Sequence, residues 1–260
     1  MADEPAAADT ASLLTFAPMV DSEACRFALN HYGVRYREEP HIFGWASMVA
    51  LRRGRTMRIP LLYGGGYRLA GARKIVDLFD RRCPPERKLL PTEKRLSDQV
   101  HADWTRFNDT LGWAVAKFAY QRLLPHRELM IEPFSRGVPA CEASVLRWAY
   151  WPFAAQFYVP LWLTPRRARE ASAQIRSIFD ETDGRLSDGR RYLAGDIFTL
   201  SDLALAASAA ALLLPDGYGS PMPPPDRMPA EMVSMRAELD QRETARFVRR
   251  IYRDHRSVAG

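Results

Sequence analysis

The chain has 260 residues, of which 47% are hydrophobic and 26% are charged, values that are ordinary for a globular protein. This length is sufficient for two modest hydrophobic cores or one large one. The formal net charge is +6, but the arginines are scattered and no nucleic-acid recognition motif is present, so we expect no nucleic-acid partner. No stretch reaches the roughly 18 uninterrupted apolar residues of a membrane-spanning helix, so we expect no membrane partner either.

The amino-terminal residues 1–12 are predicted to form a disordered tail, since they are rich in alanine and acidic residues. They lack the basic and apolar regions of a secretory signal. The three cysteines, Cys25, Cys83 and Cys141, are far apart and odd in number, which argues against a disulfide framework and favours a cytoplasmic location. The five histidines show no ligand spacing, so we expect no metal site.

The first part of the chain alternates strand and helix patterns. An apolar run predicts a strand over 13–16, and apolar residues at helical spacing predict a helix that begins near Glu23, is capped by Asp21 or Ser22, and ends at Gly33. A second strand is expected over 34–38, followed by irregular or weakly helical chain over 40–57. Two further strands, 59–63 and 67–69, flank a glycine turn, and the helix after them ends before residue 83.

The second part shows only helical patterns. After a proline-rich linker over 83–92, apolar residues three or four apart predict one long amphipathic helix over 96–115. Further helices are expected over 166–180, 200–214 and 232–250, and residues 215–229 carry six prolines and form a rigid loop. The sequence therefore predicts an α/β domain over 13–82 followed by an all-helical domain over 93–260.

Two short signatures lie about 140 residues apart. Ile59-Pro60 precedes the glycine turn, while Thr199 and Asp202 have the spacing of a helix capping box in Gly-Asp-Ile-Phe-Thr-Leu-Ser-Asp. Together they resemble the cytosolic glutathione transferase superfamily, although no class within it can be assigned. The resemblance implies a thioredoxin-like domain followed by an all-α domain, and a homodimer.

The resemblance also implies a glutathione site. In the family, the residue before a cis-proline pairs its backbone with glutathione, a contact that Ile59 and Pro60 would supply here whatever the side chain. The acidic residue and serine that hold the other end of glutathione in the family are replaced by Gly71 and Ala72. Backbone amides at the start of that helix, together with Arg73, are the remaining candidates for binding a carboxylate.

The expected catalytic position also departs from the family. The usual serine or cysteine position holds Met19, and the usual tyrosine position holds Thr15. Ser22 is the other hydroxyl near the helix start, where it could donate to a thiolate or simply cap the helix. Ser22 and Thr15 are therefore the catalytic candidates.

The electrophile pocket of the family lies between its two domains. The stretch from Trp148 to Trp162 holds seven aromatic residues in 15 positions and could form an apolar wall, an inter-helix core or a dimer contact. Met19, Trp104, Trp148 and Trp151 are the predicted pocket residues.

Two functions remain open at this stage. One is a glutathione transferase-like enzyme that adds the glutathione thiol to a hydrophobic, aromatic electrophile, or uses it to isomerise or cleave one. The other is a catalytically degenerate protein of the same fold that binds a hydrophobic ligand or a protein partner. The replacements at Met19, Gly71 and Ala72 favour the second.

Overall fold

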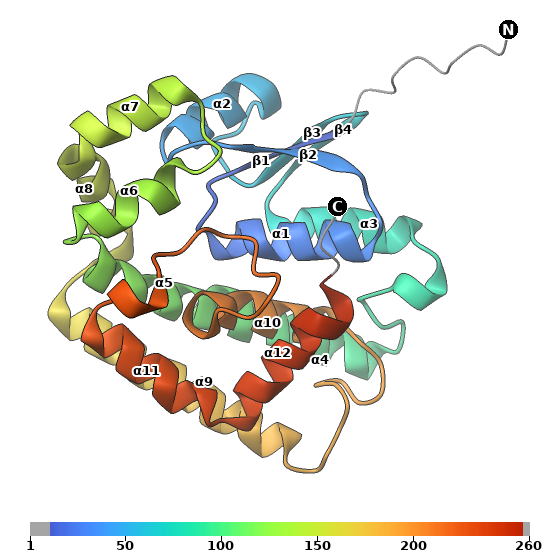
Figure 1. Ribbon diagram of the computed structural model, residues 1–260. Coiled ribbons are helices and arrows are strands. Elements are labelled where there is room, and N and C mark those ends of the chain that lie inside the picture. Colours follow the sequence, from blue (N-terminus) through green and yellow to red (C-terminus); the bar gives the residue numbers. More distant parts are fainter. Residues whose placement is uncertain (1–10, 257–260) are drawn as a thin grey trace, which may run out of the picture.

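A four-stranded sheet with helices on both faces forms the first part of the computed structural model, which describes residues 11–256 (Figure 1). The strand order is β2-β1-β3-β4, with β1 parallel to β2 and antiparallel to β3, and β3 antiparallel to β4. Helices α1 and α3 cover one face and α2 the other. The elements of this part are β1 (Ala11–Thr15), α1 (Val20–His31), β2 (Tyr36–Pro40), α2 (Trp45–Gly54), β3 (Leu61–Gly64), β4 (Tyr67–Ala70) and α3 (Ala72–Arg82).

The second part is helical in Figure 1, apart from its connecting loops. Its central helix is the apolar α10, which packs against α1 on one side and against α4, α5 and α12 on others. The elements are η1 (Pro85–Arg87), α4 (Lys94–Trp104), η2 (Thr105–Leu111), α5 (Gly112–Leu123), α6 (Arg127–Ser135), α7 (Ala140–Trp148), α8 (Tyr150–Leu161), α9 (Pro165–Leu186), α10 (Leu200–Leu213), η3 (Pro225–Arg227), α11 (Ala230–Asp240) and α12 (Glu243–His255).

The predicted βαβ-then-ββα order is confirmed, but several boundaries differ. Most of the predicted tail lies outside the described residues, and Ala11 and Ser12 belong to β1. Strand β2 begins later than predicted because Val34 is still part of the helix end. The amide of Val34 donates to the Leu29 carbonyl, and Gly33, at φ +70°, donates to Asn30. These two bonds form a Schellman motif, which confirms that Gly33 ends α1 and keeps Val34 out of the strand.

The start of α1 corrects the predicted cap. The helix begins at Val20 with Met19 as its N-cap, so Asp21 and Ser22 lie inside the first turn. Neither side chain caps the helix; the Ser22 hydroxyl donates instead to the Phe16 carbonyl at 2.8 Å. The capping box at Thr199 is present, since Asp202 accepts hydrogen bonds from the backbone amide and the hydroxyl of Thr199.

Two of the predicted long helices are interrupted. The predicted helix over 96–115 is the helical run α4–η2–α5, whose middle segment η2 is π-helical. The predicted last helix is two helices, α11 and α12, separated near Gln241 and Arg242. The break is fixed by Asp183 on α9, which accepts hydrogen bonds from the backbone and the hydroxyl of Thr244.

Polar contacts join the two parts beside the hydrophobic core. His41, just after β2, lies with its Nδ1 2.6 Å from Glu142 Oε1 on α7, and the Ile42 amide donates to the other oxygen of the same carboxylate. This pairing holds the loop before α2 against the helical part, and it brings Phe43 to the cavity described below.

Candidate functional site

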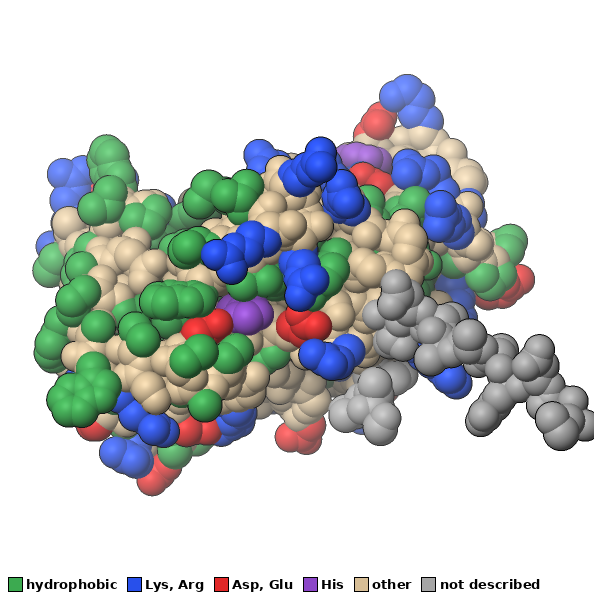
Figure 2. Space-filling model, turned by 90° about the horizontal axis from the view of Figure 1, so that it is seen from above, with side chains coloured by type: hydrophobic (Ala, Val, Ile, Leu, Met, Phe, Trp, Pro, Cys, Tyr) green, Lys and Arg blue, Asp and Glu red, His purple; other side chains and the backbone are tan. Residues whose placement is uncertain are grey.

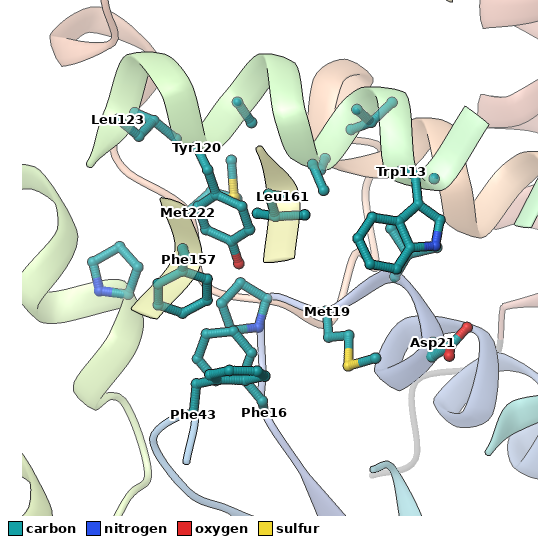
Figure 3. Close-up of a pocket in the computed structure, with 18 of the residues that line it drawn as sticks. Phe16, Met19, Asp21, Phe43, Trp113, Tyr120, Leu123, Phe157, Leu161 and Met222 are labelled. Atoms are coloured by element: carbon teal, nitrogen blue, oxygen red, sulfur yellow. The ribbon is translucent and has the colours of Figure 1, made fainter. Parts of the chain in front are cut away.

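An apolar pocket of about 210 Å³ lies where the loop after β1 meets the helical part (Figure 3). Its walls come from the segment 16–21, Phe43, the η2–α5 segment, α6, α8, and α10 with the loop after it. Aromatic rings form one side of it: Phe157 lies 5.1 Å from Phe43 and 5.1 Å from Tyr120, measured between ring centroids, and Phe16 lies 5.7 Å from Phe157. Such a cavity suits a small aromatic or hydrocarbon ligand.

On one side of the pocket, α5 approaches the start of α1 closely. Gly112, the first residue of α5, has no side chain, and a Cβ placed there would lie 3.1 Å from Val20 Cγ1. The π-helical segment before it turns Asn108 and Asp109 to the pocket lining. Stretches of π-helix are often found at functional sites, and here the segment supplies two of the polar residues that line the pocket.

Tyr120 carries the one hydroxyl among the residues that line the pocket. In Figure 3 its oxygen is directed into the cavity, between Phe157 and Leu161. Burial raises the pKa of this hydroxyl far above its ordinary value, so at neutral pH it is protonated and can donate a hydrogen bond. Within residues 11–256 it has no hydrogen-bonding partner, which leaves it available to a ligand.

The hydroxyls of both predicted catalytic residues donate hydrogen bonds within the fold. Ser22 is fully buried and donates to the Phe16 carbonyl. Thr15 is also fully buried and donates to Glu38 Oε1 at 2.6 Å. Neither residue is among those that line the pocket, and their catalytic role stays a prediction.

The predicted glutathione contacts lie apart from the pocket lining. The Ile59–Pro60 peptide bond is cis, and the Pro60 carbonyl accepts a hydrogen bond from the Gly71 amide at 2.8 Å. Within the part of the chain that the structure describes, the N–H and C=O of Ile59 form no hydrogen bond. Ala72 is buried at the start of α3.

Arg73 is not free to bind an anion. Its Nε donates to Asp77 on the next turn of α3 at 2.8 Å, and its Nη2 lies 2.5 Å from Nε2 of His101. A ligand carboxylate would have to compete with Asp77 for this guanidinium.

Only Met19 of the four predicted pocket residues lies in the pocket wall. Trp104 is buried in the helical core, at 7% exposure, and does not reach the cavity. Trp148 and Trp151 are 92% and 60% exposed and face outward. Figure 2 shows hydrophobic side chains gathered on the side of the molecule where α7 and α8 lie. The aromatic stretch contributes instead through Phe157 and Leu161, on the inner face of α8.

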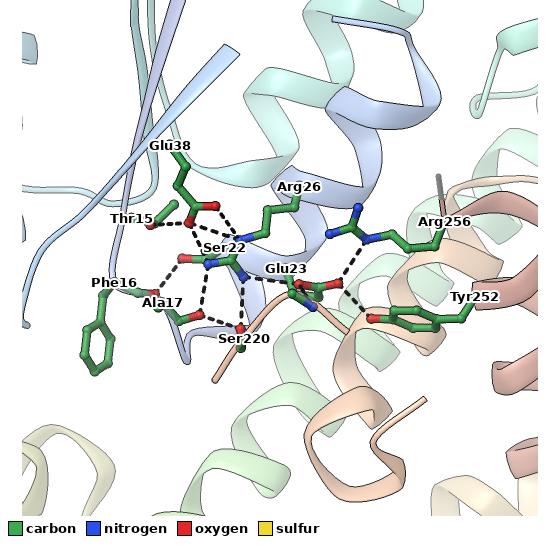
Figure 4. A network of polar contacts seen from close by, with 11 residues as sticks. Thr15, Phe16, Ala17, Ser22, Glu23, Arg26, Glu38, Ser220, Tyr252 and Arg256 are labelled. Atoms are coloured by element: carbon green, nitrogen blue, oxygen red, sulfur yellow. Dashed lines mark hydrogen bonds and ion pairs between the residues drawn. The ribbon is translucent and has the colours of Figure 1, made fainter. Parts of the chain in front are cut away.

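A buried polar network holds one wall of the pocket in place (Figure 4). Glu23 on α1 accepts hydrogen bonds from Arg26, the Gly219 amide, Tyr252 and Arg256. Arg26 also donates to Ser220 at 2.9 Å. The network thereby ties the proline-rich loop, which carries the lining residues Pro221 and Met222, to α1.

Glu38 completes the charge balance of this network. It accepts hydrogen bonds from Arg26 Nη2 at 2.7 Å and from Thr15. Burial alone would raise the pKa of the Glu38 carboxyl, but the hydrogen bonds and charge of Arg26 outweigh this effect and hold the pKa below its ordinary value. Two carboxylates thus balance the two guanidinium groups of Arg26 and Arg256.

Among residues 11–256, no group of three or more His, Cys, Asp and Glu side chains is arranged to hold a metal ion. Across the same residues no helix is long and apolar enough to cross a membrane.

The fold is that of the glutathione transferases, as comparison with solved structures shows. A glutathione S-transferase of Ceriporiopsis subvermispora in complex with glutathione aligns over 96% of this chain and 99% of its own, with a TM-score of 0.60 at 14% identity. Glutathione S-transferase I from maize, in complex with an atrazine glutathione conjugate, aligns over 94% and 99%, with a TM-score of 0.55 at 17% identity. The beta-etherase LigF from Sphingobium sp. strain SYK-6 aligns over 92% and 98%, with a TM-score of 0.56 at 14% identity. No protein-family model matches the chain, and no curated protein matches its sequence.

Proposed function

We propose that the protein binds a small, apolar, aromatic ligand in the pocket between the β1–α1 loop and the helical part. One observation carries the proposal: the cavity is walled by aromatic and aliphatic side chains, while the hydroxyls expected to activate a thiol are buried in the fold. Tyr120 gives such a ligand a hydrogen-bond donor and thereby an orientation.

A variant in which a larger side chain fills the pocket tests the proposal. Ala116 is half-buried in the lining of the pocket on α5, so Ala116→Phe fills the space without adding charge. Ala102 is an exposed alanine on α4, and Ala102→Phe is the matched control. The probe is N-phenyl-1-naphthylamine, which is uncharged at neutral pH and whose fluorescence increases in apolar surroundings.

We expect micromolar binding of the probe by the unmodified protein and by Ala102→Phe, with a loss of about tenfold or more in Ala116→Phe, which is the affinity equivalent of about 1.4 kcal/mol. Equal affinities in all three proteins, or no binding by the unmodified protein, would contradict the proposal. Circular dichroism establishes that both variants are folded.

The second candidate is a glutathione-dependent enzyme. Two observations favour it: the unpaired backbone groups of Ile59, and the bound glutathione of several solved structures with this fold. On this route glutathione would pair along Ile59, and Tyr120 would be the donor nearest to a bound electrophile.

Calorimetric titration with glutathione separates the two candidates. A dissociation constant at or below the millimolar range, together with conjugation of 1-chloro-2,4-dinitrobenzene that falls at least tenfold in Tyr120→Phe, would favour the enzyme. No detectable heat and no protection against thermal unfolding would leave the apolar-ligand protein as the function. The homodimer and the cytoplasmic location expected from the resemblance stay predictions.

A further inference from the structure

The charged residues that line the pocket are both acidic. Asp21 and Asp109 lie at the lining, and no lysine, arginine or histidine accompanies them there. Neither carboxylate forms an ion pair within residues 11–256, although the chain as a whole carries a net charge of +6. The lining of this pocket therefore carries negative charge, although the chain as a whole is positively charged.

Asn108 brings the two acids together. Its side-chain amide donates to Asp21 Oδ1 at 2.8 Å and to Asp109 Oδ1 at 3.2 Å. Asn108 is only 7% exposed, and its own Oδ1 has no partner in the described part of the chain. The NH₂ group of Asn108 therefore donates within the cluster. The groups of the cluster without a donor of their own are acceptors, namely the two carboxylates and the Asn108 amide oxygen.

Trp113 lies beside these acceptors. It is one turn after Asp109, it lines the pocket, and it is 49% exposed, so its ring borders the opening. Figure 3 shows Trp113 and Asp21 together on one side of the cavity, with Phe16, Phe43 and Phe157 on the other. An indole face next to carboxylates is favourable for a cation, since the ring quadrupole and the negative charges act in the same direction.

The surroundings of the Asp21 carboxylate also favour the binding of a cation. Burial raises the pKa of its carboxyl and Asp109 adds to the rise, whereas the hydrogen bond from Asn108 opposes it. The ionised carboxylate is thus short of solvation and of counter-charge. A bound cation would supply both, and the thiolate or carboxylates of an anionic ligand would be repelled.

We propose that this end of the pocket, formed by Asp21, Asp109, Asn108 and Trp113, binds the protonated amine of a ligand whose aromatic body fills the apolar end. The inference rests on the proposed pocket function and adds the chemical class of the ligand to it. The ligand is an amphipathic aromatic amine, not the anionic conjugate that the fold alone would suggest.

Three naphthyl compounds of similar size test the inference: 1-naphthylmethylamine is a cation at neutral pH, 1-naphthylmethanol is neutral, and 1-naphthoate is an anion. Each is titrated against bound N-phenyl-1-naphthylamine in the full-length protein at one pH. The variants are Asp21→Asn and Asp109→Asn, which keep shape and remove charge. Asp98→Asn, on the exposed surface of α4, is the control for loss of a negative charge elsewhere.

We expect the amine to bind about tenfold more tightly than the alcohol, with the anion weakest, because hydrogen bonds between an ammonium group and a carboxylate are stronger than those between neutral groups. The preference should fall below about threefold in Asp21→Asn, decrease in Asp109→Asn and stay unchanged in Asp98→Asn.

Equal binding of amine and alcohol by the unmodified protein, or an unchanged preference in Asp21→Asn, would overturn the inference and leave the apolar pocket standing. If the fluorescent probe itself does not bind, the proposed function fails instead, and the two failures are thereby distinguishable.

Discussion

Glu23 is a buried carboxylate that accepts four hydrogen bonds, and its replacement is expected to destabilise the fold. Its carboxylate is fully buried and accepts hydrogen bonds from Arg26, Gly219, Tyr252 and Arg256, which belong to α1, the proline-rich loop and α12 (Figure 4). Replacement by alanine removes four acceptor contacts at once. It also removes one of the two negative charges that balance Arg26 and Arg256.

The expected loss of stability follows from the two buried guanidinium groups that the substitution leaves in place. The side chains of Arg26 and Arg256 are only 3% and 6% exposed, so solvent cannot take the place of the lost carboxylate. Removing one partner of a buried ion pair typically costs about 3–5 kcal/mol, because it leaves an uncompensated buried charge. We expect Glu23→Ala to lower the free energy of unfolding by this amount, and Glu23→Gln, which keeps an acceptor oxygen, to lower it less.

Urea unfolding followed by circular dichroism and by tryptophan fluorescence measures this change. The control is Glu132→Ala on α6, which removes an exposed carboxylate paired with Arg136 and should cost only about 0.5 kcal/mol. Because Glu23 anchors the loop that carries Met222, probe affinity should also fall in Glu23→Ala. A loss of stability below about 1 kcal/mol in Glu23→Ala would refute the reasoning that this network is closed to solvent.

Three further predictions concern single contacts. Ser22→Ala removes the donor to the Phe16 carbonyl and should cost about 1–3 kcal/mol in urea unfolding while leaving ligand binding unchanged; a loss of activity at full stability would restore Ser22 to a catalytic role. Gly112→Val places a branched side chain against Val20 and should destabilise by about 1–3 kcal/mol and weaken probe binding; full affinity would show that α5 does not need this close approach. Burial raises the pKa of the Asp202 carboxyl to about 6, above the ordinary 3.8. Between these two pH values the folded protein binds a proton at Asp202 that the unfolded chain has released. This group therefore stabilises the protein below about pH 4 and loses that contribution as the pH rises through about 6, at up to about 1.4 kcal/mol per pH unit, and Asp202→Asn should flatten that part of the unfolding profile; an identical slope in both proteins would contradict the assignment.

The order of elements could be predicted because it depends on local signals. Gly33 and the capping box at Thr199 set helix ends through contacts a few residues apart, and the structure confirms both. The break between α11 and α12 could not be predicted in the same way, since it depends on Asp183, 61 residues before Thr244. Local patterns indicate where a helix can form, while a distant partner decides where it stops.

The site was predicted less well for a similar reason. Ser22 and Thr15 lie at sequence positions where a hydroxyl could take part in catalysis. Only the folded structure shows that these hydroxyls donate to the Phe16 carbonyl and to Glu38. Trp148 and Trp151 were predicted from the aromatic stretch that contains them, whereas the pocket is lined by Phe157 and Leu161 of the same stretch. The lining residues of η2 and α5 were not predicted: Trp113 follows Asp109 by one helical turn, a spacing that the sequence shows but that is equally typical of any amphipathic helix.

The structural changes around the pocket are consistent with one another. A site that stabilises a thiolate needs donors and positive charge at the start of α1. This chain has Met19 there, a Ser22 hydroxyl turned into the protein, and Asp21 facing the cavity beside a second carboxylate. Each of these features disfavours an anion, and together they are the basis of our proposal that this end of the pocket binds a cation. The proposal therefore predicts that the amine binds more tightly than the alcohol and the alcohol more tightly than the anion.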